Sequence, residues 1–351
     1  MRNLFKTLQK AALLALFTFL TTAMLLESEM ALELSLNGLN LWFQKMIPTL
    51  LPFMILSGIL IRMNLSDSFA RLFSPILRPL FGLSDACLYV LVVGFLCGFP
   101  MGARVTAESL RHGRITRREA SLLLAFCNNI GPIYFTGFVL HLFPVPTPLP
   151  YLAGMYLLPL LYGLFLRHTF YRDIPLAGKT PDKLAGRFRL PFGGKASAVQ
   201  TLPSAVGRLR KRNAASHIHA ASIEALSKPS LLAHTQDSIL SSLIAIASLG
   251  GYMILFNLMN LIPELLLPRS ASLSRALCAC LLEITSGLSR LPATDAFWAF
   301  VLLPFGGLSC IAQTYSMISD TGLSLNQYVF HKWIQTLLAF LYYSSLPRLL
   351  P

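Results

Sequence analysis

Helix breakers and polar residues interrupt two apolar segments of near-membrane length between residues 94 and 137, which read GFLCGFPMGARVTAESLRHGRITRREASLLLAFCNNIGPIYFTG. Glycine and proline weaken or break a helix, and in lipid such a break persists only where protein or a water-filled cavity satisfies the freed backbone groups. The segment is therefore predicted to form the wall of an intramembrane binding site. Its candidate substrate-binding residues are Gly98, Pro100, Gly102, Asn128, Asn129 and Gly131.

The chemistry of these residues suits an anion or a polar ring. Gly98 and Gly102 permit close approach to the backbone, and the free N–H groups of a half-helix that starts there would attract an anion. Asn128 and Asn129 can donate to a carboxylate or accept from a ring or cation. Two alternatives stay open: the glycines serve tight helix packing, and the amides cap the broken helix or hold it to a neighbour.

Glu283 is the only acid in the apolar segment 273–291. An ionisable residue at membrane depth is a candidate for proton or sodium coupling, or for holding a substrate hydroxyl. The alternatives are a buried partner for Arg275 or Arg104, or a position at the membrane interface. Further candidates for the site are Thr285, Ser286, Gln313 and Thr314.

Composition places the chain in the membrane. Of its 351 residues 54% are hydrophobic and 13% are charged, whereas about a quarter are charged in soluble domains. The net charge of +14 falls between apolar runs, as expected for cytoplasmic loops, so nucleic acid is not an expected partner. No metal-ligand spacing and no pair of nucleophile and base is visible, so neither a metal site nor an enzyme is expected.

Four regions follow from the apolar pattern. They are a first membrane helix with an outer acidic turn (1–36), a first repeat (37–166), a basic linker (167–236) and a second repeat (237–351). The linker is expected to be cytoplasmic and disordered, and to act as a topology anchor or to touch anionic lipid. An amphipathic segment is expected at 65–81, a break inside the helix 120–141, and further spans at 39–63, 151–166, 238–262 and 328–343.

The two repeats are predicted to be inverted with respect to each other. The apolar run 86–103 has basic residues at both ends, which is typical of a re-entrant hairpin, and Gly306 in the run 297–317 aligns with Gly98. Arg104 could attract an anion there, while Arg111, Arg114, Arg117 and Arg118 are expected to be topology charges. Because the second half has fewer basic residues, its hairpin at 297–317 is expected to enter from outside. Both termini are expected to be cytoplasmic.

Three motifs resemble a known family. GFxxGFPMGAR (94–104), LxxGxITxxEA (110–120) and AFCNNIGPIY (125–134), together with the Glu-x-Thr-x-Gly fragment at Glu283, look like YlbJ-type sporulation integral membrane proteins. These carry the nucleoside-recognition (Gate) domain and are similar to parts of concentrative nucleoside transporters. The resemblance covers about 39–166 and 238–343, and the long basic linker departs from it.

The resemblance implies an all-α polytopic transporter that moves dipicolinic acid, a planar dianion, from the mother cell across the outer forespore membrane. Its partners would be the small anionic substrate and the bilayer, no cofactor is expected, and coupling to H+ or Na+ stays open. A homodimer or trimer is plausible by analogy. The alternatives are a nucleoside-type permease, since fold does not fix substrate, and a membrane assembly factor for sporulation without transport.

Overall fold

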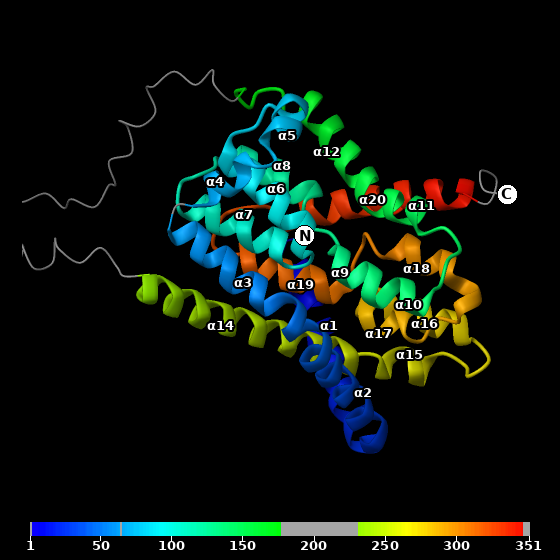
Figure 1. The fold of residues 1–351 in the computed structure, drawn as a ribbon. Coiled ribbons are helices and arrows are strands. Elements are labelled where there is room, and N and C mark those ends of the chain that lie inside the picture. The colour runs from blue at the N-terminus through cyan, green and yellow to red at the C-terminus, as the bar shows by residue number, and fades with distance from the viewer. Residues whose placement is uncertain (1, 64, 177–230, 347–351) are drawn as a thin grey trace, which may run out of the picture.

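The computed structural model describes residues 2–63, 65–176 and 231–346, which contain helices and connecting turns and no strand (Figure 1). The all-α prediction is confirmed. The helices of the first half are α1 (Arg2–Leu26), α2 (Ser28–Leu41), α3 (Ile47–Arg62), α4 (Ser66–Arg71), α5 (Ser74–Phe81), α6 (Asp85–Cys97), α7 (Met101–Arg111), α8 (Arg117–Phe126), α9 (Pro132–Tyr134), α10 (Leu140–Leu142), α11 (Pro148–Leu152) and α12 (Leu158–His168). The helices of the second half are α14 (Leu231–Leu258), α15 (Leu261–Leu266), α16 (Ser272–Leu282), α17 (Ile284–Leu288), α18 (Ala296–Leu302), α19 (Gly307–Ile318) and α20 (Leu325–Ser345).

Some of these helices join into longer apolar rods. Four are long and apolar enough to cross a bilayer, and the bent pair α5 and α6 would make a fifth if it counts as one span. The chain is therefore an integral membrane protein. Two expected spans are not among the four: the first membrane helix, whose apolar part Lys10–Leu26 is shorter than a span, and α20, whose buried face carries Lys332, Gln335 and Thr336. The four rods are Ser28–Arg62, Pro148–His168, Leu231–Leu266 and Ala293–Ile318.

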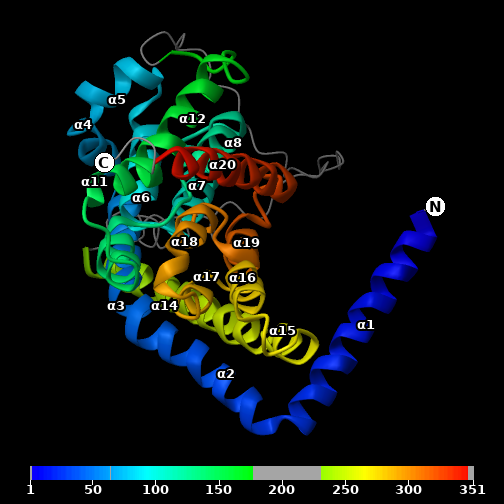
Figure 2. The same cartoon turned by 90° about the vertical axis from the view of Figure 1, so that its right-hand side faces the viewer.

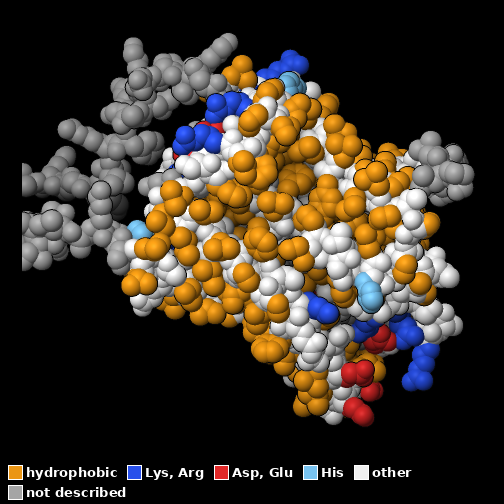
Figure 3. Space-filling model, in the orientation of Figure 1, with side chains coloured by type: hydrophobic (Ala, Val, Ile, Leu, Met, Phe, Trp, Pro, Cys, Tyr) orange, Lys and Arg blue, Asp and Glu red, His pale blue; other side chains and the backbone are white. Residues whose placement is uncertain are grey.

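The surface agrees with a membrane location. Figure 3 shows apolar side chains over much of the face in view, with lysine and arginine gathered near its top and its lower right, and acidic side chains beside the latter. An apolar band between charged ends is what a bilayer-spanning protein presents to lipid and water.

α1 extends away from the rest of the protein (Figure 2). Its side chains Leu13, Leu14 and Phe17 are 62%, 67% and 69% exposed. The acidic residues that follow α1 lie at the start of α2 and within it: Glu27 precedes its first residue, Glu29 occupies its first turn and Glu33 lies further along. A carboxylate in the first turn is favourable because the N-terminal end of a helix is partly positive.

α14 packs along α2 and α3, and at one contact a glycine of α14, Gly250, lies against a large side chain, Trp42. Trp42 lies in a π-helical turn (Trp42–Met46) between α2 and α3, and its indole N–H donates to the carbonyl of Ile246 at 2.8 Å. Gly250 faces the indole ring so closely that a Cβ on it would lie 2.5 Å from the ring. The absence of a side chain on Gly250 therefore fixes how near α14 approaches.

α6 and α7 form the first hairpin, which reverses at residues 98–100. Gly94 on α6 faces Gly102 on α7, since a Cβ on Gly94 would lie 3.3 Å from the Gly102 Cα. Gly98 ends α6 with φ +81°, a conformation that side chains with a Cβ rarely adopt. The chain therefore reverses direction between α6 and α7 at this point.

The second hairpin lies one segment earlier than expected. α16 reverses into α17 at Glu283, with Gly287 so close to the Cys280 backbone that a Cβ would lie 2.2 Å from its nitrogen. The run 297–317 instead belongs to the rod Ala293–Ile318, in which Gly306 and Gly307 interrupt the helix without a reversal. Gly307 lies against the Cys280 carbonyl, where a Cβ would come within 2.9 Å of the oxygen. A glycine at this position therefore leaves space for the backbone of the second hairpin.

The helix expected at 120–141 is broken where the sequence indicated. α8 ends at Phe126, residues 127–131 are not helical, and α9 begins at Pro132. A capping box begins α8, with the Thr116 hydroxyl accepting from Glu119 N–H and the Glu119 carboxylate accepting from Thr116 N–H. Its counterpart in the second half is present in part, because Ser324 accepts from Gln327 N–H.

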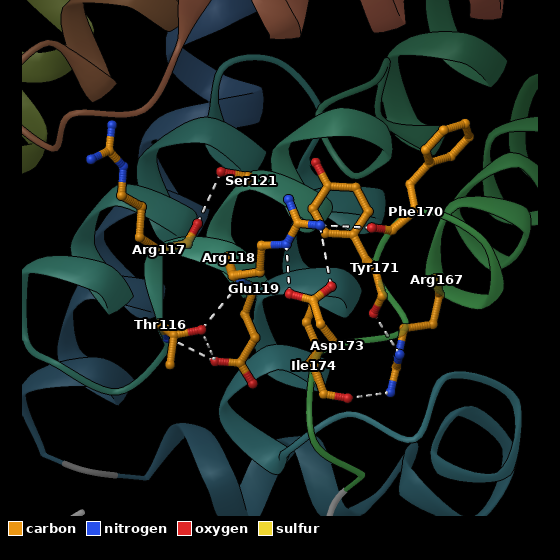
Figure 4. Close-up of polar contacts among 10 residues, drawn as sticks. All are labelled: Thr116, Arg117, Arg118, Glu119, Ser121, Arg167, Phe170, Tyr171, Asp173 and Ile174. Carbon is orange, nitrogen blue, oxygen red and sulfur yellow. Dashed lines mark hydrogen bonds and ion pairs between the residues drawn. The ribbon is translucent and has the colours of Figure 1, made fainter.

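Arginines fasten the chain after α12 to the start of α8 (Figure 4). The Arg118 guanidinium donates to both carboxylate oxygens of Asp173, at 2.9 and 3.2 Å, and lies over the Tyr171 ring. Buried Arg167 donates to the carbonyls of Phe81, Tyr171 and Ile174. Residues 167–176, the start of the expected linker, are thus packed, and its part at 177–230 lies outside the described residues.

Candidate functional site

A cavity of about 60 Å³ lies where both hairpin turns, the break between α8 and α9, and the facing sides of α3 and α14 meet. Most of its wall is apolar. Its polar side chains are Thr49, Tyr134, Glu283, Thr285 and Gln313. At about 10–15 Å³ of such volume for each water, it has room for about four to six waters.

The turn of the first hairpin touches the broken helix. A Cβ on Gly98 would lie 2.3 Å from the backbone nitrogen of Gly131, and a Cβ on Gly131 would lie 2.9 Å from the carbonyl oxygen of Cys97. Both glycines are therefore needed for the backbones to meet. Cys97, Phe99 and Gly131 all line the cavity at this contact.

Glu283 forms the turn of the second hairpin and is 2% exposed. Its carboxylate accepts from the backbone N–H of Thr285 at 3.1 Å and of Ser286 at 2.7 Å, so it caps α17. Neither Arg275 nor Arg104 pairs with it: Arg275 binds Glu264, and Arg104 lies elsewhere. Among the described residues that line the cavity, Glu283 is the only acidic or basic one whose side chain is charged at neutral pH in water.

Asn128 joins three helices at the break. Its carbonyl oxygen accepts from Ala103 N–H on α7 at 3.2 Å, and its amide donates to the hydroxyls of Thr314 on α19 and Tyr328 on α20, both at 3.0 Å. Both polar side-chain atoms of Asn128 thus form hydrogen bonds within the protein. This arrangement matches the alternative that the amide holds the broken helix to its neighbours.

Asn129 and two residues of α20 satisfy the end of α8. Its last carbonyls have no partner within the helix. The Asn129 amide donates to Phe126 O at 2.6 Å and the Gln335 amide to Ala125 O at 2.6 Å. The Lys332 ammonium donates to the Asn128 carbonyl and to the Asn129 side-chain oxygen, the latter at 2.7 Å.

The sequence interpretation did not single out Lys332, although it is completely buried. A lone lysine within the apolar run 328–343 was the available signal, because an ionisable residue at membrane depth is a functional candidate. Its ammonium lies 4.6 Å from the centre of the Phe99 ring, which lines the cavity. Tyr134 was also missed: its buried hydroxyl reaches the cavity wall and has no hydrogen-bond partner of normal geometry among the described residues.

The structure divides the twelve predicted site residues into three groups. Gly131, Glu283, Thr285 and Gln313 line the cavity. Arg104 lies apart, with α3 and α14. The others lie in or behind the cavity wall, as the first hairpin turn, as hydrogen-bonded supports or as backbone packing; they are Gly98, Pro100, Gly102, Asn128, Asn129, Ser286 and Thr314.

Comparison with known proteins agrees with the motifs. Residues 43–143, which include the first hairpin and the helix break, match the family model Gate, described as nucleoside recognition. Over 343 residues the chain is 26% identical to the sporulation integral membrane protein YlbJ of Bacillus subtilis (strain 168), covering 91% of this chain and 78% of that protein. No solved structure matches the chain. The predicted resemblance to YlbJ and to the Gate family is confirmed.

Proposed function

We propose, from this similarity to a sporulation membrane protein with a nucleoside-recognition region, that the chain is a sporulation-associated transporter. Its proposed substrate is a small organic anion, dipicolinic acid, moved from the mother cell towards the forespore. The observation that carries the proposal is the meeting of two hairpin turns and a broken helix at one cavity. Backbone that leaves the helix at membrane depth is the usual construction of a transporter site.

In this proposal α6–α7 and α16–α17 are the two re-entrant hairpins of an inverted repeat. The open ends of both hairpins carry arginines that are paired with an acid. Arg111 closes α7 and binds Asp320, whereas Arg275 and Arg290, from the two arms of the second hairpin, both bind Glu264 at 2.6 and 2.8 Å. The Glu264 pair holds those arms together, so the hairpin would move as one body.

The cavity is too small for the proposed substrate in its present shape. A pyridine ring with two carboxylates exceeds the space of a few waters, so one hairpin has to withdraw before the substrate enters. The small contact between Gly98 and Gly131 is a natural place for that separation, because no side chain interlocks there.

Charge adds a requirement for a proton. A dianion and the Glu283 carboxylate would repel each other strongly at the few ångströms available in an apolar cavity. Binding of the anion therefore needs a proton on Glu283 or on the substrate. On this proposal H+ is the coupling ion and Glu283 is the residue that carries it.

The same residue favours one alternative, a nucleoside-type permease. A Glu283 carboxylate that stays ionised would accept hydrogen bonds from sugar hydroxyls, while Thr285 and Gln313 offer further polar contacts and Phe99 an aromatic face. An assembly factor without transport is the remaining alternative, and it would leave the polar cavity unused.

Uptake into proteoliposomes separates the three functions. Labelled dipicolinate and labelled uridine are offered with and without an inward proton gradient, to wild type, Glu283→Gln and Asn129→Ala, with Glu29→Gln as a matched control on an exposed acid of α2. We expect gradient-driven dipicolinate uptake that Glu283→Gln uncouples from the gradient and that Glu29→Gln leaves unchanged. Asn129→Ala is expected to reduce uptake by loosening the helix break.

Other outcomes assign the alternatives. Uptake of uridine alone, lost in Glu283→Gln, would replace the anion with a nucleoside while keeping the site. No uptake of either compound by correctly folded protein would favour the assembly factor.

A further inference from the structure

A second group of buried charges lies between α3, α7 and α14, away from the cavity. Arg104 on α7 is 6% exposed, and its guanidinium donates to the hydroxyls of Ser241 at 3.4 Å and Ser242 at 3.3 Å. Arg62 at the end of α3 donates to the same Ser241 hydroxyl at 3.3 Å. The two arginines thus converge on one pair of serines in α14.

Each guanidinium keeps one nitrogen without a partner. Nη1 of Arg62 and Nη1 of Arg104 are both buried, and neither has a hydrogen-bond partner in the described part of the chain. Two arginines that share a serine also repel each other. Buried charged donors without acceptors cost several kcal/mol, so this arrangement calls for an additional acceptor.

The acids nearby do not supply it. Glu108 lies one turn along α7 from Arg104 and is 8% exposed, yet its Oε2 is itself buried without a hydrogen-bond partner and it makes no ion pair with either arginine. Asp320 binds Arg111 and Asp67 binds Arg114, while Asp237, one turn before Ser241 on α14, is exposed and makes no ion pair within the described residues. Two arginines against one buried glutamate therefore leave one positive charge without a buried counter-charge.

The backbone is shaped to hold this group. Gly58 on α3 faces α14, and a Cβ there would lie 2.3 Å from the Ser238 hydroxyl and 3.2 Å from Arg62 Nη1. The Ser238 hydroxyl in turn donates to the Ile55 carbonyl at 2.7 Å. The small residue and the serine contact bring α3 and α14 close enough for both arginines to reach Ser241.

We infer that Arg62 and Arg104 form an oxyanion-binding site with the hydroxyls of Ser241 and Ser242. Its ligand is a carboxylate or a phosphate group that accepts from the two free Nη1 nitrogens. Guanidinium groups suit such oxygens because their planar N–H forks match them.

This site does not depend on the proposed transport function. None of its residues lines the central cavity. It would bind an oxyanion in a transporter of any substrate and equally in an assembly factor. The oxyanion could come from a free anion in solution or from the headgroup of an anionic phospholipid, and both sources offer the same chemistry.

Thermal unfolding of the purified full chain in an uncharged detergent tests the site. Inorganic phosphate and phosphatidylglycerol are titrated separately at constant ionic strength, against wild type, Arg104→Gln, Arg104→Lys and Arg62→Gln. The matched control is Arg111→Gln, which removes a half-exposed arginine that already has an acid partner. We expect a saturable rise in unfolding temperature for wild type and for the control.

Either glutamine variant should weaken the apparent affinity at least tenfold, and Arg104→Lys should recover part of it. Stabilisation by phosphate identifies a free oxyanion, and stabilisation by phosphatidylglycerol alone identifies a headgroup. The inference is overturned if neither probe stabilises wild type, or if Arg104→Gln, Arg62→Gln and Arg111→Gln respond alike. Should one glutamine variant fail to fold, the other and the wild-type titration still decide the question.

Discussion

Replacing Lys332 with methionine tests whether this buried lysine holds the break between α8 and α9. Methionine has a similar length and no charge, so it fills the space while removing the donor. The Lys332 ammonium donates to the Asn128 carbonyl and, at 2.7 Å, to the Asn129 side chain; its third contact, to Gln335 at 3.4 Å, is too long to contribute much. Two acceptors in the break after α8 would lose this partner.

The magnitude follows from two opposing terms. Each acceptor left unpaired in the interior costs about 1–3 kcal/mol, so the loss is about 2–6 kcal/mol. Burial of an ammonium costs several kcal/mol, and methionine removes that cost. Because Lys332 also lies at the partly negative end of α8 and over the Phe99 ring, we expect the first term to win, with a net destabilisation of about 2 kcal/mol.

The assay is equilibrium unfolding in mixed micelles, followed by far-ultraviolet circular dichroism, for Lys332→Met, Asn129→Ala and the double variant. The coupling energy between the two sites should be about 1.5–3 kcal/mol, the value of a charge-assisted hydrogen bond. Lys45→Met, at an exposed lysine, is the control and should change stability by less than about 0.5 kcal/mol. A Lys332→Met protein at least as stable as wild type, with no coupling to Asn129, would refute the reasoning.

Two further predictions concern stability. Gly287→Ala should destabilise the second hairpin by about 1–3 kcal/mol, because the added methyl group would overlap the α16 backbone. Gly251→Ala is the control in the same unfolding assay. Because the space around Gly251 is open, this variant should be neutral or slightly stabilising. Hydrogen bonds from Arg118 hold the pKa of the Asp173 carboxyl below its ordinary value. Asp173 therefore contributes stability in full above about pH 4, the ordinary value, and loses that contribution as the pH falls through the lower pKa of the folded state. Unfolding between pH 7 and pH 3 should be less acid-sensitive in Asp173→Asn, and equal acid sensitivity would contradict the contact.

Local signals were enough to predict the breaks and caps. The Asn128–Pro132 segment disfavours a continuous helix, because proline lacks a donor and the amides compete for backbone groups. The Thr116 and Glu119 pair starts α8 for an equally local reason. These features depend on interactions between residues that are close together in the sequence, so the sequence is enough to predict them.

The second hairpin could not be located in the same way. Gly306 and Gly307 look like a turn in the sequence, but a glycine is needed equally where another backbone comes close, and Gly307 meets the second hairpin. Glu283 does reverse the chain, and nothing local distinguishes a cap at a hairpin turn from a charged residue facing lipid. The choice depends on what packs against each segment.

The sequence by itself determined the membrane class of this protein and the break at residues 127–131, because hydrophobicity and backbone chemistry act over short distances. Tertiary structure alone decided which polar residues share a cavity. Glu283 and Gly131 are far apart in the chain and line one space, whereas Arg104, two residues from Gly102, turns to α14 instead. It also gave Lys332 its role, since the oxygens it binds lie in the break after α8, far from Lys332 in the chain. Contacts of this kind depend on which helices meet, and that is set by the packing of all of them together.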